Sequence, residues 1–265
     1  MRRSDVRHQS SDEHHDHHCY VPGLTATQGD SRRACARLHR GNRHSLDAAV
    51  DARVIILTGA GRGFCAGQDL NDRAVAPGEP VDLGATVEES WNPLVRRLAT
   101  MPQPVIACVQ GVATAAGCQL VAACDLAIAS HSARFATSGV NLGLFCSTPA
   151  VAITRSVAPK HAAELLFGGD FITVEQAERW GLINRCVDEE TLVQAASDWA
   201  QAIASKSGAA IMSGKALLRK QRNLSLVDAY AAAGENMAQD ILTEDAIMGI
   251  DAFLNKQPSP EWKHR

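Results

Sequence analysis

The segment PVIACVQGVATAAGCQLVAACDLAIAS, residues 104–130, indicates the fold class. Its two ends, 104–113 and 125–130, are short apolar runs with the length and flanking residues of buried strands. The stretch between them has the character of a helix. A third run of the same kind, ARVIILTGA, occupies residues 52–60. Because strands that alternate with helices are typical of a parallel sheet, the sequence predicts an α/β fold.

The chain after residue 159 is predominantly helical. PKHAAELLFGG at 159–169 starts with a proline and closes on glycines. TVEQAERWG at 173–181 carries a capping box at its start and a glycine at its end. Four further helical stretches fill residues 190–256. We therefore divide the chain into an atypical N-terminal segment, an α/β core and a C-terminal helical region: residues 1–51, 52–190 and 191–265.

The N-terminal segment differs from the rest of the chain. It holds most of the ten histidines and has no apolar periodicity, so we expect much of it to be poorly ordered. The histidines and the cysteine of DEHHDHHC, residues 12–19, are residue types that bind transition metals. A solvated tail with incidental metal affinity accounts for the same pattern. We favour the tail, and no metal site is predicted.

The composition excludes several classes of partner. The formal net charge is −3 and the two signs are interspersed beyond residue 50, which argues against binding to nucleic acid or to a membrane. No apolar run is long enough for a membrane-spanning helix, and the start lacks the apolar core of a secretory signal. We therefore expect a cytoplasmic protein. Its eight cysteines are scattered without a CxxC pair, which favours reduced thiols.

The glycine-rich text after the first strand, GAGRGFCAG at 59–67, invites a dinucleotide-binding interpretation. That fingerprint requires a following helix and an acidic residue at the end of a second strand. QDLNDRAVAPGEP, which comes next, provides neither. A phosphate-binding loop of the form GxxxxGK[ST] is also missing from the sequence.

A site made of exposed main-chain amides explains these small residues better than a dinucleotide-binding loop does. The strands at 52–58 and 104–110 each end in a small-residue turn, FCAGQD and VATAAGCQ. Ligands gather at the carboxyl ends of parallel strands, so the N–H groups of Gln68 and Ala116 could converge on one oxygen as an oxyanion hole. A helix that begins near Gly117 would direct its positive end there. Small residues at strand ends also serve close packing, and the spacing alone leaves both interpretations open.

Four segments resemble successive signatures of the crotonase superfamily, the enoyl-CoA hydratase/isomerase family. They are TGAGRGFCAGQDL, GCQLVAACDLAIAS, ARFATSGVNLGLF and AERWGLINRCV, within a match over about residues 52–265. The resemblance implies a spiral of ββα units with a C-terminal trimerisation region, in a homotrimer or a dimer of trimers. It implies an acyl-CoA or enoyl-CoA ligand in fatty-acid metabolism, with no separate cofactor. By position it gives the carbonyl-binding amides to Gln68 and Ala116, and the residues next to CoA are Ala66, Gly67, Asp69, Leu70 and Lys263.

The chain departs from this family at the acid and base positions. Where hydratases of the family carry two glutamates, this sequence has Gln119 and Gly139, and Ser147 stands at a third site used by isomerases and a dehalogenase. An amide transfers no proton at neutral pH, and each acid or base contributes about 10² to 10⁴ in rate. Hydration is therefore in doubt. The alternatives are another CoA-thioester reaction, such as a decarboxylation, and a non-catalytic acyl-CoA binder.

Overall fold

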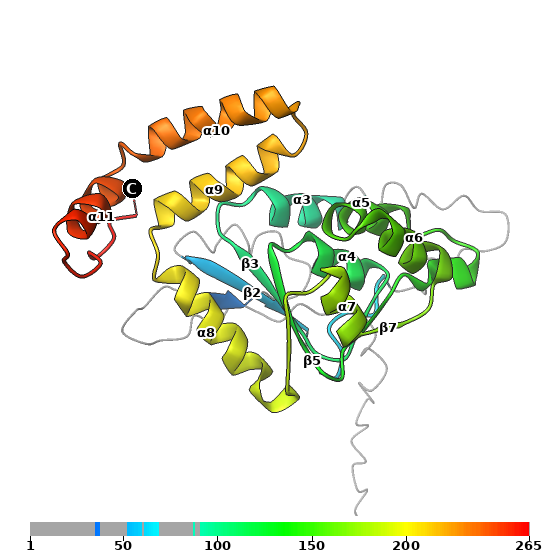
Figure 1. Ribbon diagram of the computed structural model, residues 1–265. Helices are drawn as coiled ribbons and strands as arrows, with labels where there is room; N and C mark the ends of the chain where they lie inside the picture. Colours follow the sequence, from blue (N-terminus) through cyan, green and yellow to red (C-terminus); the bar gives the residue numbers. More distant parts are fainter. Residues whose placement is uncertain (1–34, 38–51, 60, 69–86, 88–90, 265) are drawn as a thin grey trace, which may run out of the picture.

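The computed structural model describes residues 35–37, 52–59, 61–68, 87 and 91–264 (Figure 1). Within these residues, five parallel strands form the central sheet in the order β1-β2-β3-β5-β8. The three apolar runs of the sequence are neighbouring strands in it, which confirms the predicted α/β fold. The strands are β1 (Cys35–Arg37), β2 (Val54–Thr58), β3 (Val105–Val109), β5 (Leu126–Ser130) and β8 (Arg185–Val187).

Both faces of the central sheet are buried, which explains why its strands are continuously apolar. Ile55, Leu57 and Val105 belong to the core on one face. Val54, Ile56 and Ile106 belong to the core on the other face, where they meet Leu192, Ala196 and Ala200 of α8 (Leu192–Ala204). Because α8 packs on the sheet, it belongs to the core. The first helix that leaves the core is the next one, α9.

A second, smaller sheet continues the two central strands. Its order among the described residues is β4-β6-β7, with β4 and β6 parallel and β7 antiparallel to β6. β4 follows β3, and β6 follows β5, so the chain repeats a strand–strand unit that leads into helices. The strands are β4 (Val112–Thr114), β6 (Arg134–Ala136) and β7 (Ile172–Thr173).

Helices on the first face of the sheet enclose the main core. α7 shows the predicted capping box, in which Thr173 and Gln176 satisfy each other's main-chain N–H groups, and it ends at Gly181 with φ +80°. The helices are α3 (Asn92–Thr100), α4 (Ala116–Ala123), α5 (Ser147–Ser156), α6 (Pro159–Gly168) and α7 (Val174–Trp180), with short 3₁₀ turns η3 (Ser138–Leu142) and η4 (Glu189–Thr191).

Three helices extend from the core as an arm, drawn from yellow to red in Figure 1. They are α9 (Gly208–Gln221), α10 (Leu226–Asp240) and α11 (Glu244–Leu254), and both α10 and α11 contact α9. In the described part of the chain, no helix is both long and apolar enough to cross a membrane. Large apolar side chains of the arm are nevertheless exposed: Leu226, Val227, Tyr230, Met237, Ile241, Leu242, Ile247, Ile250, Phe253 and Leu254.

A buried lysine fastens α9 to the core. The Lys215 ammonium lies 2.6 Å from an Asp125 carboxylate oxygen and donates to the carbonyl oxygens of Leu98 and Gln103. Arg219 binds the second carboxylate oxygen at 2.8 Å. Burial lowers the pKa of Lys215, and the nearby Asp125 carboxylate counters that effect. The ion pair therefore fixes where the arm leaves the core.

The C-terminal tail closes back on the base of the arm. Asp245 of α11, whose surface is 1% exposed, accepts hydrogen bonds from the Ser207 hydroxyl and the N–H groups of Lys263 and His264. Burial raises the pKa of Asp245, but these hydrogen bonds outweigh it and leave the pKa below its usual range. Lys263, a predicted CoA contact, therefore lies at the arm. Of the predicted N-terminal segment only β1 falls among the described residues, so its disorder stays a prediction.

Candidate functional site

The two small-residue turns of the sequence lie side by side. Cys65 forms a parallel bridge with Ala113, and the Thr114 N–H donates to the Cys65 carbonyl at 3.0 Å. Phe64 and Cys65 in turn both donate to the Val112 carbonyl. The turn that follows β2 is thus held along β4, next to the start of α4. The sequence alone leaves it open whether these two turns meet.

Gly67 lies close to the second of these two turns. Its φ is +99°, and a Cβ at this position would lie 3.1 Å from the Ala115 Cβ and 3.6 Å from the Ala116 nitrogen. Gln68 follows directly, so its N–H belongs to a peptide group at this contact. The main chains of Gln68 and Ala116 are therefore neighbours. Convergence of their two N–H groups on one ligand oxygen stays a prediction.

Gly117 allows α4 to begin this close to the other turn. A Cβ at Gly117 would lie 2.1 Å from the Cys65 carbonyl oxygen, a distance that no side chain tolerates. Ala116 is the first residue of α4, and the first N–H groups of an α-helix have no acceptor inside the helix. The glycine thus brings the positive end of the helix against the segment that carries Gln68.

The residue before the helix has a strained backbone. Ala115 has φ 51° and ψ −115°, a combination that residues with a Cβ seldom adopt. Its N–H donates to the Ala136 carbonyl at 3.0 Å, which holds the turn in place. Strain of this kind costs about 1–3 kcal/mol and gathers at functional sites. No pattern in the sequence identified Ala115, because the small-residue turn predicts permissive backbone without giving its dihedral angles.

Gln119 is buried one turn further along α4. The residue is 3% exposed, and its amide nitrogen donates to the Thr148 carbonyl of α5 at 3.1 Å. Its amide oxygen Oε1 is buried and accepts no hydrogen bond from the described residues. A buried polar atom in this condition is a candidate for contact with a ligand. Thr148, which orients the amide, was missed by the sequence because a main-chain contact leaves no signature.

Gly139 has no room for a side chain. It lies in η3, and the Leu144 N–H donates to its carbonyl at 2.9 Å. A Cβ at Gly139 would lie 2.4 Å from the Leu144 carbonyl oxygen and 2.8 Å from the Cys146 sulfur. The loop that leads into α5 therefore fills the space in which a larger residue would begin. Packing therefore requires glycine at position 139, and a glycine provides no carboxylate for catalysis.

The nucleophile-capable residues near this loop are poorly activated. Ser147 is an exposed residue at the start of α5, and its hydroxyl lies 3.4 Å from the Phe145 carbonyl oxygen. Among the described residues, neither Ser147 nor Cys146 is hydrogen-bonded to a histidine. Burial, with a smaller effect of nearby Cys146, raises the pKa of the Cys118 thiol to about 12. The Cys118 thiol therefore stays protonated at neutral pH, and no histidine of the described residues activates the Ser147 hydroxyl.

The remaining predicted residues have separate outcomes. Ala66 is exposed beside Gly67. Asp69 and Leu70 lie outside the described residues, as do the histidines of 12–19. Lys263 lies next to α11, where its N–H donates to the Asp245 carboxylate at 2.7 Å, and its predicted contact with CoA stays a prediction.

A cavity of about 1240 Å³, here called the interhelix cavity, lies between α4 and the helices α3, α5 and α9. Gln119 and Thr148 are part of its lining, so it begins one helical turn from Ala116. The sequence did not predict this cavity. Its walls come from segments that are far apart in the chain.

Comparison with known proteins gives consistent matches. A family profile described as enoyl-CoA hydratase/isomerase matches residues 44–265. The mitochondrial enoyl-CoA hydratase domain-containing protein 3 of Rattus norvegicus is 43% identical over 214 residues, covering 81% of this chain and 70% of that protein. The 1,2-epoxyphenylacetyl-CoA isomerase of Escherichia coli K12 is 47% identical over 156 residues, 58% of this chain and 60% of that protein.

Solved structures agree with these matches. The crystal structure of human enoyl-CoA hydratase domain-containing protein 3 has a TM-score of 0.79 and 35% identity, and the match covers 91% of this chain and 100% of the other. The comparisons confirm the resemblance carried by the four sequence segments, and with it the crotonase fold class.

The expected cytoplasmic location is corrected by these relatives. The enoyl-CoA hydratase domain-containing proteins 3 of rat, mouse, frog, human and zebrafish are all named as mitochondrial proteins. The prediction failed because it tested only for a secretory signal. Mitochondrial targeting segments are amphipathic and rich in arginine and serine, so a missing continuous apolar core says nothing about them.

Proposed function

Because this chain belongs to the enoyl-CoA hydratase/isomerase family, we propose that it binds an acyl-CoA or enoyl-CoA and polarises the thioester carbonyl with the N–H groups of Gln68 and Ala116. The observation that carries the proposal is the contact of Gly67 with Ala115 and Ala116. It brings two main-chain donors to neighbouring positions at the start of α4. No separate cofactor enters the proposal, and the acyl group is that of a fatty acid.

The chemistry follows from where negative charge would develop. When the α-carbon of a thioester loses a proton or CO₂, the electron pair of the broken bond delocalises onto the carbonyl oxygen, which becomes an enolate oxygen. Two fixed donors and the positive end of α4 stabilise that oxygen, and a lost donor costs about 10²- to 10³-fold in rate in known oxyanion holes. The donors belong to the main chain, so substitutions elsewhere in the site leave them in place.

The reaction in which the enolate forms is the second part of the proposal. Gln119 and Gly139 provide no carboxylate, and Ser147 has no base beside it, so we expect hydration to be slow. A decarboxylation needs no protein base to begin, because loss of CO₂ itself generates the enolate. A non-catalytic acyl-CoA binder is the alternative. Screening CoA thioesters by mass spectrometry separates the two, since only the first converts any of them.

The binding proposal is tested by calorimetry and infrared spectroscopy with crotonyl-CoA and octanoyl-CoA. We expect both to bind and the thioester carbonyl stretch to move to lower frequency in the complex. Ala116→Pro removes one N–H at a helical position that tolerates proline, so it should reverse much of that shift and depress any turnover by more than about tenfold.

Leu226→Pro is the matched control for that variant. It introduces proline at the first position of α10, where Leu226 is 75% exposed, and should leave the carbonyl frequency unchanged. The proposal would be refuted if calorimetry showed no binding of either thioester and free CoA displaced no ligand from the protein. An unchanged carbonyl frequency in Ala116→Pro would remove Ala116 from it and leave the binding itself intact.

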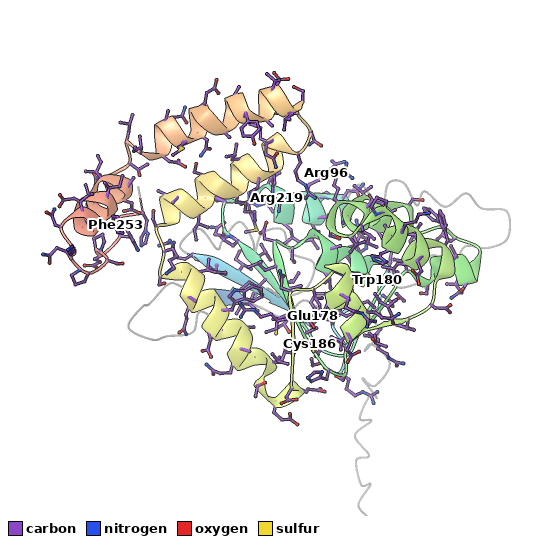
Figure 2. All side chains as sticks on the ribbon, in the orientation of Figure 1. Arg96, Glu178, Trp180, Cys186, Arg219 and Phe253 are labelled. Atoms are coloured by element: carbon purple, nitrogen blue, oxygen red, sulfur yellow. The ribbon has the colours of Figure 1, made fainter. Side chains whose placement is uncertain are left out.

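We also infer that the arm assembles the chain into a homotrimer or a dimer of trimers. Exposed apolar side chains on α10 and α11 support this inference, because contiguous apolar surface on a monomer is normally covered. Phe253, labelled on α11 in Figure 2, is 82% exposed. Phe253→Glu should lower the mass in native mass spectrometry, while Gln239→Glu on α10 should not. A monomeric wild-type protein would contradict the inference.

A further inference from the structure

We propose that the interhelix cavity receives the acyl chain and selects acyl groups that end in a carboxylate. The inference rests on the proposed function, because it takes the thioester to lie at the start of α4. It adds the class of substrate, an ω-carboxyacyl-CoA. Three observations carry it: the position of Gln119, the common direction of α4 and α5, and the charge at the far end of the cavity.

Gln119 links the thioester end to the cavity. It follows Ala116 by three residues, a helical rise of roughly 4.5 Å, and it lines the interhelix cavity. The residue is only 3% exposed, yet its Oε1 atom has no hydrogen-bond partner in the described part of the chain. A polar atom in this condition points to a ligand at this end of the cavity.

The helices α4 and α5 run from the thioester end toward the same far end. At the near end, Gln119 of α4 contacts the Thr148 carbonyl in the first turn of α5. At the far end, α5 reaches Arg155, and α4 is followed by Asp125. Seven residues separate Thr148 from Arg155, a helical rise of roughly 10 Å. Small and apolar residues line the space between these ends: Ala122, Val151, Ala152 and Leu182.

The far end of the cavity is strongly basic. Its charged lining consists of one carboxylate and five cations, which is a net charge of +4 within a chain of net charge −3. Figure 2 shows two of the cations, Arg96 from α3 and Arg219 from α9, at this end of the molecule. The cations are Arg96, Arg155, Lys215, Arg219 and Arg222, and the carboxylate is Asp125.

Among the residues that the structure describes, a single carboxylate lines the basic end together with the five cations. Asp125 binds Lys215 at 2.6 Å and Arg219 at 2.8 Å, so the single carboxylate of the lining is already shared. The Nε atom of Arg219 is buried without a hydrogen-bond partner among the described residues. Arg155 donates to the Val151 carbonyl of its own helix and remains exposed. Guanidinium groups bind carboxylates in a forked geometry, so a carboxylate at this end would satisfy several of these donors.

The test compares two ligands of equal chain length, dodecanedioyl-CoA and dodecanoyl-CoA, whose acyl chains are long enough to extend from Ala116 to Arg155, by calorimetry on the 265-residue chain. Charge-assisted hydrogen bonds in a partly buried site predict that dodecanedioyl-CoA binds at least about tenfold more tightly. Arg155→Gln should reduce that preference several-fold, and Arg155→Gln combined with Arg219→Gln should abolish it. Lys220→Gln is the matched control, because it removes a charge from α9 outside the cavity and should leave the preference unchanged.

Each outcome decides the inference. Equal affinity for the two thioesters, or a preference that survives in the double variant, would overturn it and leave the proposed function standing. Failure of both ligands to bind would instead refute the proposed function. If Arg155→Gln weakens binding of free CoA and dodecanoyl-CoA as much as binding of dodecanedioyl-CoA, the cations serve a CoA phosphate and the substrate class is wrong. Arg219 also binds Asp125, so the double variant could lose stability, and the melting temperature is therefore measured together with affinity. If the double variant is unfolded, the result for Arg155→Gln decides the test.

Discussion

Gly117→Ala is expected to destabilise the protein and to abolish polarisation of a bound thioester carbonyl. The new Cβ would lie 2.1 Å from the Cys65 carbonyl oxygen and 2.9 Å from the Cys65 carbonyl carbon. Both are main-chain atoms, so the start of α4 or the turn beside it must move. Overpacking of this kind costs about 1–3 kcal/mol or more. The same movement separates the main chains of Gln68 and Ala116, so any turnover should fall by more than about a hundredfold.

Gly234→Ala is the matched control for this prediction. Gly234 lies inside α10, and a Cβ there would meet nothing within 4 Å. Alanine should therefore gain up to about 1 kcal/mol from helix propensity and leave the site unchanged. Chemical denaturation gives the stabilities, and infrared spectroscopy of bound crotonyl-CoA gives the carbonyl frequency. If Gly117→Ala behaved like Gly234→Ala in both measurements, the close approach would have no functional role.

Gln119→Glu is expected to raise the rate of crotonyl-CoA hydration by about 10². The donors of the proposed oxyanion hole belong to the main chain and survive the change, whereas the missing component is a group that transfers a proton. Gln119 lies one helical turn from Ala116, so a carboxyl group there would stand within reach of the α- and β-carbons of the acyl chain. The rate is measured from the loss of enoyl absorbance, with Gln119→Met as the control that removes the amide without adding an acid.

The introduced carboxyl group should act at a raised pKa. In the native protein the amide nitrogen of Gln119 donates to the Thr148 carbonyl at 3.1 Å, and an ionised carboxylate could not replace that donation. Burial also disfavours the charged form. We therefore expect the carboxyl to keep its proton to a pH above the usual value of about 4.3. If the carboxylate acts as the base, the rate of the variant should rise with pH through this raised pKa.

A second carboxylate is not expected to help. Gly139→Glu would place its Cβ 2.4 Å from the Leu144 carbonyl oxygen, so the loop into α5 must unfold locally to accept it. The variant should lose stability, and adding it to Gln119→Glu should give no further rate. If the unmodified protein already hydrates crotonyl-CoA at an ordinary enzymatic rate, about 10 s⁻¹, the role given to Gln119 is wrong.

The sequence by itself determined several secondary-structure elements and the small residues that form the site. Apolar runs of strand length predicted β2, β3 and β5 as strands of a parallel sheet, and the capping box predicted the start of α7. Small residues after β2 and β3 indicated that the two turns could meet, and the sequence left close packing open as the alternative. These signals are local, because periodicity and capping depend on residues within one or two turns of each other.

The tertiary structure alone decided how these parts fit together. The backbone angles of Ala115 and the loop that fills the space beside Gly139 depend on contacts that no local pattern encodes. The interhelix cavity is a stronger case, since Arg96, Arg155 and Arg219 reach it from α3, α5 and α9. Each arginine sits on a helix whose own sequence predicts only a solvated charge. Packing between distant segments brings the three charges to one cavity, because burying the apolar faces of the helices fixes where their polar ends meet.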